Sequence, residues 1–147
     1  MDRRSLIAGL CSLALGTAAI RIDTSRAEEA GKVLAKGRFK GTSLTIRGRG
    51  TASIVQLENG EKLLRLSSFS VSKGPDLKVW LVKQAEIRTE DQVTGGDTLA
   101  LGPLRSFSGD QDYAIPDGVD VSQYQSAIIW CEKFVHLFAS ANLKPES

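Results

Sequence analysis

The sequence predicts an all-β protein, an antiparallel β-sandwich or barrel of about eight short strands in a single domain. Apolar residues fall in short alternating or continuous runs, and Gly, Pro and Asn-Gly signals separate these runs. No long segment repeats its apolar residues every 3.6 positions, so the helices that a parallel α/β fold needs between its strands are not predicted. No nucleotide-binding glycine fingerprint follows a strand either.

The predicted elements follow in order along the chain. Strands are expected at residues 33–39, 43–47, 51–57, 62–69, 77–82, 98–101, 113–115, 126–131 and 134–141. The Asn59-Gly60 pair predicts a hairpin turn, and Pro75 fixes φ in the turn before the strand at 77–82. Residues 84–97 are polar and contain two adjacent glycines, so we expect a loop there. Asp120 is expected to cap one helical turn at 120–124.

The first 27 residues have the pattern of a secretory signal peptide. Arg3 and Arg4 precede an apolar run at residues 6–20, and small residues permit cleavage after Ala27. The run is too short for a good membrane span, which needs roughly 18 apolar residues. The paired arginines fit the twin-arginine export route, with the ordinary secretory route as the alternative. We therefore expect a periplasmic or secreted domain at 28–147, with no stable membrane span after cleavage.

The formal charge is balanced once the leader is removed. The chain has 19 basic and 17 acidic side chains, and the leader contains four of the basic and two of the acidic ones. The domain at 28–147 is left with fifteen of each. This composition gives no excess of basic residues for binding nucleic acid or an anionic membrane, so we expect no nucleic-acid partner.

Cysteine, histidine and methionine are scarce, and this scarcity excludes several kinds of site. Cys131 is the only cysteine after the leader, His136 is the only histidine, and Met1 is the only methionine. Blue copper needs two histidines, c-type haem and thioredoxin-type exchange need a second cysteine, and zinc needs three or four ligands. A Ser-His-acid triad would have one candidate base and no nucleophile elbow. We therefore expect no metal site, and enzymes are the less favoured class.

Cys131 is the candidate functional residue, and three interpretations of it stay open. It is a buried apolar side chain, a thiol used in redox chemistry or an intermolecular bond, or a thiolate ligand to a haem or another metal. In an extended strand Ala127, Ile129 and Cys131 share one face, and Ile128 and Trp130 share the other. Both faces are apolar, which predicts a central strand or one covered on both sides.

Eight different short motifs are spread across the domain, and together they indicate a resemblance to a known family. They are G-R-F at 37–39, G-T-A-S-I at 50–54, L-R-L-S-S-F at 64–69, G-P-D-L-K-V-W-L at 74–81, L-G-P-L at 101–104, Q-D-Y-A-I-P at 111–116, D-V-S-Q-Y-Q-S-A-I-I-W-C at 120–131 and F-V-H-L-F at 134–138. In these motifs the chain resembles the DM13 family, a small β-rich module of exported and cell-surface proteins. The matches run in the family's order over nearly the whole domain.

The resemblance implies an electron-transfer or redox module whose hallmark cysteine matches Cys131. That cysteine would act as a naked thiol or help to hold a prosthetic group, with a redox or cell-envelope protein as partner and the cofactor unknown. The hypothesis places Trp130, Phe134 and Phe138 as an apolar wall around the sulfur, with His136 as a further cofactor-binding candidate. The alternative is a non-catalytic binding or structural module of the cell envelope in which Cys131 is simply packed.

The chain also departs from the pattern of bacterial relatives. Those proteins carry histidines at places where Ile46, Lys78 and Val135 stand in this sequence, and His136 is one position out of step. If the histidines bind a metal in the relatives, this chain has lost that site. The departure therefore weakens the interpretation of Cys131 as a metal ligand.

Overall fold

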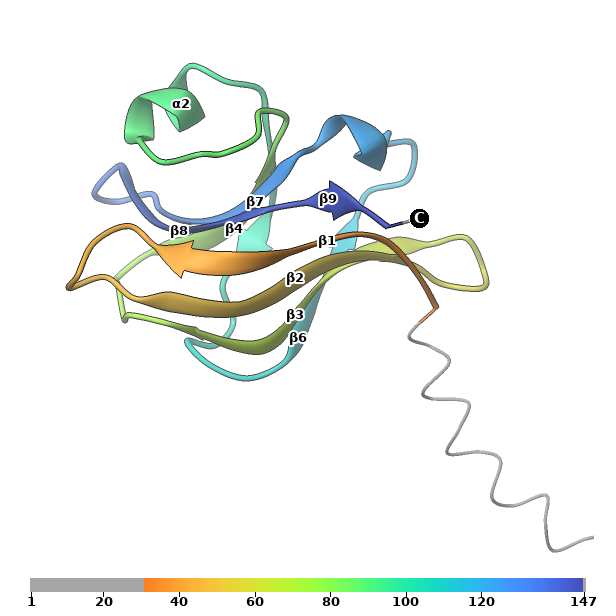
Figure 1. Ribbon diagram of the computed structural model, residues 1–147, viewed down its shortest axis with the longest axis horizontal. Helices are drawn as coiled ribbons and strands as arrows, with labels where there is room; N and C mark the ends of the chain where they lie inside the picture. Colours follow the sequence, from red (N-terminus) through yellow and green to blue (C-terminus); the bar gives the residue numbers. More distant parts are fainter. Residues whose placement is uncertain (1–30, 147) are drawn as a thin grey trace, which may run out of the picture. The chain divides into compact units, whose positions relative to one another are not determined.

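The computed structural model describes residues 31–146, which form one antiparallel sheet of nine strands, curled into a nearly closed barrel (Figure 1). The strand order is β5-β4-β7-β8-β1-β2-β3-β6, β9 pairs with β1, and the edge strands β5 and β6 lie near each other. The bounds are β1 Lys32–Gly41, β2 Gly48–Gln56, β3 Lys62–Val71, β4 Leu77–Val82, β5 Thr98–Pro103, β6 Gln111–Ile115, β7 Ser126–Cys131, β8 His136–Asn142 and β9 Lys144–Pro145. The predicted fold class is confirmed.

The predicted signal peptide at residues 1–27 lies outside the described residues. Its cleavage site and the domain limits at 28–147 therefore stay predictions. Among residues 31–146, no helix is long and apolar enough to cross a membrane.

Strand β1 joins the two halves of the barrel because it pairs with different strands along its length. Residues 32–38 pair with β2, and Phe39, Lys40 and Gly41 pair with β8. Gly37 lies where β1 passes from one partner to the other, and a Cβ atom there would overlap the carbonyl oxygen of Asn142. The close approach of two backbones at this point requires a residue without a side chain.

The apolar side chains form two separate clusters on the two faces of the β4-β7-β8 half. The interior cluster fills the barrel with residues from most strands, including Phe39, Ile54, Leu64, Phe69, Leu81, Ile129 and Phe138. The outer cluster contains Val82, Ile87, Val93, Ile128, Trp130 and Leu137. Strand β7 contributes to both, and all six of its residues are buried. The predicted central strand, covered on both faces, is confirmed.

Residues 83–97 cover the outer cluster, and we call this stretch the covering segment. Its Ile87 and Val93 are buried against β7 and β8. Hydroxyl groups of the sheet fasten it: Ser126 Oγ donates to the carbonyl oxygen of Gln84 at 2.8 Å, and Ser140 Oγ donates to that of Ile87 at 2.8 Å. An otherwise exposed apolar sheet face is thereby removed from water.

The covering segment also contains a short helix, α2 (Glu90–Thr94), where the sequence predicted only loop. Thr89 precedes the helix and Gln92 occupies its third position, which is the arrangement of a capping box. The Gln92 side chain accepts hydrogen bonds from the backbone N–H groups of Arg88 and Thr89. This local side-chain signal was present in the sequence, but five residues are too few to show a 3.6-residue period.

The predicted strand at 43–47 is wrong, because serine side chains fold this stretch into a loop. Ser43 Oγ accepts hydrogen bonds from the backbone N–H groups of Thr45 at 3.3 Å and Ile46 at 3.1 Å. Such local bonds give the backbone an alternative to a sheet ladder. The turn at Asn59-Gly60 is confirmed, with Gly60 at φ 92°, and so is the capping of a short 3-10 helix by Asp120.

Replacing Gly37 with alanine is expected to destabilise the protein strongly, because the new Cβ atom would displace the β8 backbone where the barrel closes. Insertion of a methyl group into a close-packed site costs about 1 to 3 kcal/mol when neighbours can move, and backbone moves less easily than side chains. Urea denaturation checks this, with Lys36→Ala on the exposed face of the same strand as the control. Equal midpoints for the two variants would contradict the close approach of the β1 and β8 backbones at Gly37.

Candidate functional site

Cys131 is the last residue of β7 and is completely buried, with 0% of its surface exposed. It belongs to the interior cluster together with Ala127 and Ile129, as the strand alternation predicts. Its neighbours in the sheet are Leu77 on β4 and His136 on β8. The thiol therefore lies inside the barrel close to one end, one residue before the chain emerges into an exposed turn.

Three loops close this end of the barrel, and we call them together the tip: residues 42–47, 72–76 and 132–135. The first two are joined by Ser72, whose Oγ accepts from the Arg47 N–H at 2.8 Å and whose N–H donates to the Arg47 carbonyl at 2.9 Å. The last two are joined by the Glu132 N–H, which donates to the Asp76 carbonyl at 3.0 Å. The loops are thus held as one unit (Figure 1).

An ion-pair cluster strengthens the joint between loops 72–76 and 132–135. Lys78 Nζ lies 2.7 Å from Glu132 Oε1 and 3.4 Å from Asp76 Oδ1. The hydrogen bond to Glu132, with that to Asp76 and the charges of both carboxylates, raises the pKa of Lys78. Its fully charged form therefore holds both carboxylates at the edge of the site.

Gly74 allows the tip to close tightly over the apolar interior. A Cβ atom at this position would come within 2.9 Å of the rings or methyl groups of Phe138 and Leu77. Both residues belong to the same interior cluster as Cys131, and Leu77 pairs directly with it. The loop backbone thus packs on the side chains that border the thiol.

His136 begins β8 beside Cys131 and is tied to the covering segment. Its Nδ1 lies 2.9 Å from Glu90 Oε2, and the same oxygen accepts the backbone N–H of Leu137 at 2.9 Å. The hydrogen bond from Leu137 is the main cause that lowers the pKa of Glu90, and the charge of His136 acts in the same direction. The His136 ring meets Phe138 edge-on, with centroids 5.6 Å apart. Nothing in the sequence pointed to Glu90, because its role depends on how the covering segment folds back.

The other predicted site residues are not brought together around the sulfur. Trp130 points to the opposite face of β7 and stacks on Trp80 at 5.6 Å between ring centroids, within the outer cluster. Phe134 lies in the turn with 61% of its surface exposed. Of the predicted neighbours, Phe138 shares the interior cluster with Cys131 and His136 pairs with it.

The residues near Cys131 do not fit a haem or a metal ion. Within the described part of the chain, no three His, Cys, Asp or Glu side chains are grouped as a metal centre would require. Haem ligation needs room for a macrocycle at the sulfur, whereas Cys131 is fully buried in a packed apolar cluster. What this arrangement offers chemically is a single thiol, sealed by a hydrogen-bonded tip.

The fold and this site define a small antiparallel β-barrel module with one interior thiol. The family profile described as Electron transfer DM13 matches residues 39–143. Since this match spans more than half of the chain, the protein belongs to the DM13 family, as its motifs suggested. Comparison with curated proteins and with solved structures gives no match.

Truncation of Cys131 tests its contribution to packing. Cys131→Ala removes a buried sulfur and is expected to lower the free energy of unfolding by about 1 to 3 kcal/mol. Cys131→Ser is expected to cost at least as much, because it buries a hydroxyl among apolar side chains. Ser126→Ala provides the comparison at the other end of β7, where a buried hydroxyl has the Gln84 carbonyl as partner. A serine variant as stable as the wild type would contradict the apolar surroundings of position 131.

Acid titration tests the anchoring of β8 by Glu90. Folding lowers the pKa of the Glu90 carboxyl group below its ordinary value of 4.5. The group therefore stabilises the folded state at pH values above 4.5, and this contribution is lost as the pH falls through the lowered pKa. The wild type should therefore be more stable than Glu90→Gln at pH 7, and the difference should shrink below pH 4.5. Thermal unfolding from pH 7 to pH 3 measures it, with Asp91→Gln as the control on the same helix. A difference that is constant with pH would contradict the assignment.

Proposed function

We propose that this protein is an exported redox module in which Cys131 is the reacting group and a cell-envelope protein is the partner. The observation that carries the proposal is the position of Cys131, as the only cysteine after the leader, directly before the exposed turn of residues 132–135. Membership of a family described by electron transfer supports it. The predicted signal peptide supports the exported location.

The chemistry that suits a single thiol is exchange with a disulfide of the partner. The Cys131 thiolate attacks one partner sulfur, a mixed disulfide forms, and the other partner sulfur leaves as a thiolate. Because the partner supplies the disulfide, no further oxidant is needed. The proton of the Cys131 thiol passes to solvent, which requires the site to open.

The tip has features that favour local opening. All four residues of the turn 132–135 are exposed, and Val135 is held at φ 50°, a left-handed conformation that is unfavourable for a β-branched residue. The turn's own backbone bond, from the Val135 N–H to the Glu132 carbonyl, is long at 3.3 Å. Segments of this kind open at a smaller free energy than the whole domain unfolds.

A second function is favoured by a specific observation, the complete burial of Cys131. Free cysteine is among the most buried residue types and packs as a small apolar side chain. On this view the protein is a non-catalytic binding or structural module of the cell envelope, and the sulfur only fills space. The two functions differ in how the thiol reaches solvent.

The rate at which a small disulfide reagent modifies Cys131 distinguishes them. The experiment uses the full chain with Cys11→Ser, so that one thiol remains, and urea concentrations well below the unfolding transition. Local opening exposes little new surface, so the redox function predicts a rate that hardly changes with urea. Lys78→Met should raise this rate several-fold, because it removes the cation that links Glu132 of the turn to Asp76. Lys62→Met, far from the tip, is the control.

A rate that rises with urea as steeply as global unfolding would sink the redox proposal. It would mean that Cys131 meets reagents only in the unfolded chain, and the binding-module function would take its place. The same conclusion would follow if Lys78→Met changed the rate no more than it changed global stability.

A further inference from the structure

The tip displays apolar side chains that the fold leaves without partners. Among the described residues, the large apolar side chains with the greatest exposure are Leu44 at 93%, Phe134 at 61% and Val135 at 54%. All three belong to the tip, from loops 42–47 and 132–135. Thr42 Oγ1, in the first of these loops, donates to the carbonyl of Leu137, two residues after the second loop, at 2.9 Å. Exposed apolar groups gathered at one end of a molecule mark an interaction site.

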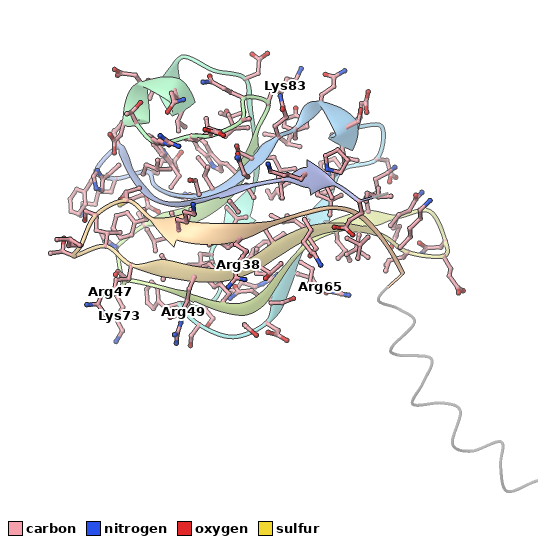
Figure 2. The ribbon with its side chains drawn as sticks, in the orientation of Figure 1. Arg38, Arg47, Arg49, Arg65, Lys73 and Lys83 are labelled. Atoms are coloured by element: carbon pink, nitrogen blue, oxygen red, sulfur yellow. The ribbon has the colours of Figure 1, made fainter. Side chains whose placement is uncertain are left out.

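Cations accompany these apolar side chains in the same loops. Arg47, Lys73 and Lys133 come one from each loop of the tip, and Figure 2 shows Arg47 and Lys73 at the same end, with Arg49 beside them. Within residues 31–146, none of the three has a carboxylate at salt-bridge distance. The tip's own carboxylates, Asp76 and Glu132, are both paired with Lys78. Its unpaired charge is therefore positive.

From this juxtaposition we propose that the tip is a membrane-docking surface that inserts Leu44, Phe134 and Val135 into an anionic lipid bilayer. Apolar side chains at the level of the acyl boundary and basic residues among the headgroups are the two terms that hold proteins on such membranes. The three apolar residues lie on two separate loops, and the side chain of Leu44 is almost fully exposed to solvent. Such separate, protruding side chains suit insertion between lipids. A protein interface would instead favour a continuous apolar centre packed as densely as an interior.

The bonds within the tip lower the entropic cost of insertion. The loops are already joined through Ser72, Glu132 and Lys78, so little conformational freedom is lost when they enter the bilayer surface. The side chains of Phe134 and Val135 are both exposed in the turn that these bonds join to the other loops. This inference stands on the tip alone and does not depend on the redox role of Cys131.

The test follows a fluorescent label at residue 44 of the full chain, with Cys11→Ser so that the leader carries no label. Leu44→Cys is combined with Cys131→Ala, so that bimane labels residue 44 alone, and is mixed with vesicles of phosphatidylglycerol and phosphatidylcholine. The label is expected to shift to the blue with these vesicles, less so as salt is added, and hardly at all with phosphatidylcholine alone. A label on Asn59→Cys, in the β2–β3 turn, is the control and should not respond.

Sedimentation with the same vesicles gives the second measurement. Replacing Leu44, Phe134 and Val135 together with serine is expected to lower the partition coefficient at least about tenfold, because the apolar area available for insertion is lost. Arg47→Gln with Lys73→Gln and Lys133→Gln should remove most of the dependence on salt. Lys62→Gln is the matched control outside the tip. Thermal unfolding of each variant establishes that it is folded.

Three outcomes would overturn the proposal. One is a label at residue 44 that does not respond to anionic vesicles, even if the protein sediments with them through another part of the chain. Another is equal partitioning of the wild type and the triple serine variant. The third is a shift of the label that depends on protein concentration without lipid, which would make the tip a contact between copies of this chain.

Discussion

The pairing of β1 with both β2 and β8 is the constraint on which the rest of the structure depends. Without the ladder at Phe39, Lys40 and Gly41, the β5-β4-β7-β8 half and the β2-β3-β6 half would be separate sheets with open edges. The ladder also fixes the loop that follows β1 next to the start of β8, and thereby brings the loops of the tip together. The pairing of β1 with β8 thus both closes the barrel and sets the positions of the loops near Cys131.

Strand β7 divides the apolar material of the domain into two layers with different roles. Its inward residues, ending at Cys131, are packed inside the barrel, whereas Ile128 and Trp130 are covered by a segment that is mostly polar in sequence. The covering segment returns to the site through Glu90, which holds both His136 and the backbone of Leu137. The beginning of β8 is consequently held by the outer layer, while the adjoining turn is free to carry exposed side chains.

The sequence was sufficient for features that depend on local pattern and insufficient for those that depend on how distant segments meet. Strands β4 and β7 have the predicted bounds, because each is a mostly apolar run that begins and ends at polar neighbours. Alternation placed Cys131 and Trp130 on opposite faces of β7, and that separation took Trp130 away from the sulfur. Leu137 lies 47 residues from Glu90, and Glu132 lies 54 residues from Lys78, so no spacing rule could find these two contacts. Balanced composition likewise gave no sign that unpaired cations and exposed apolar residues share one end.

The stacked tryptophans give the two layers separate optical signatures. Trp80 and Trp130 are the only tryptophans of the chain, and both belong to the outer face of the sheet. Tryptophan fluorescence therefore reports whether the covering segment is in place, and it responds little to rearrangement inside the barrel. The interior has its own reporters in the thiol of Cys131 and the buried ring of Tyr113. A loosening that begins at the covering segment would thus change the tryptophan fluorescence, whereas one that begins at the tip would change the reactivity of the Cys131 thiol.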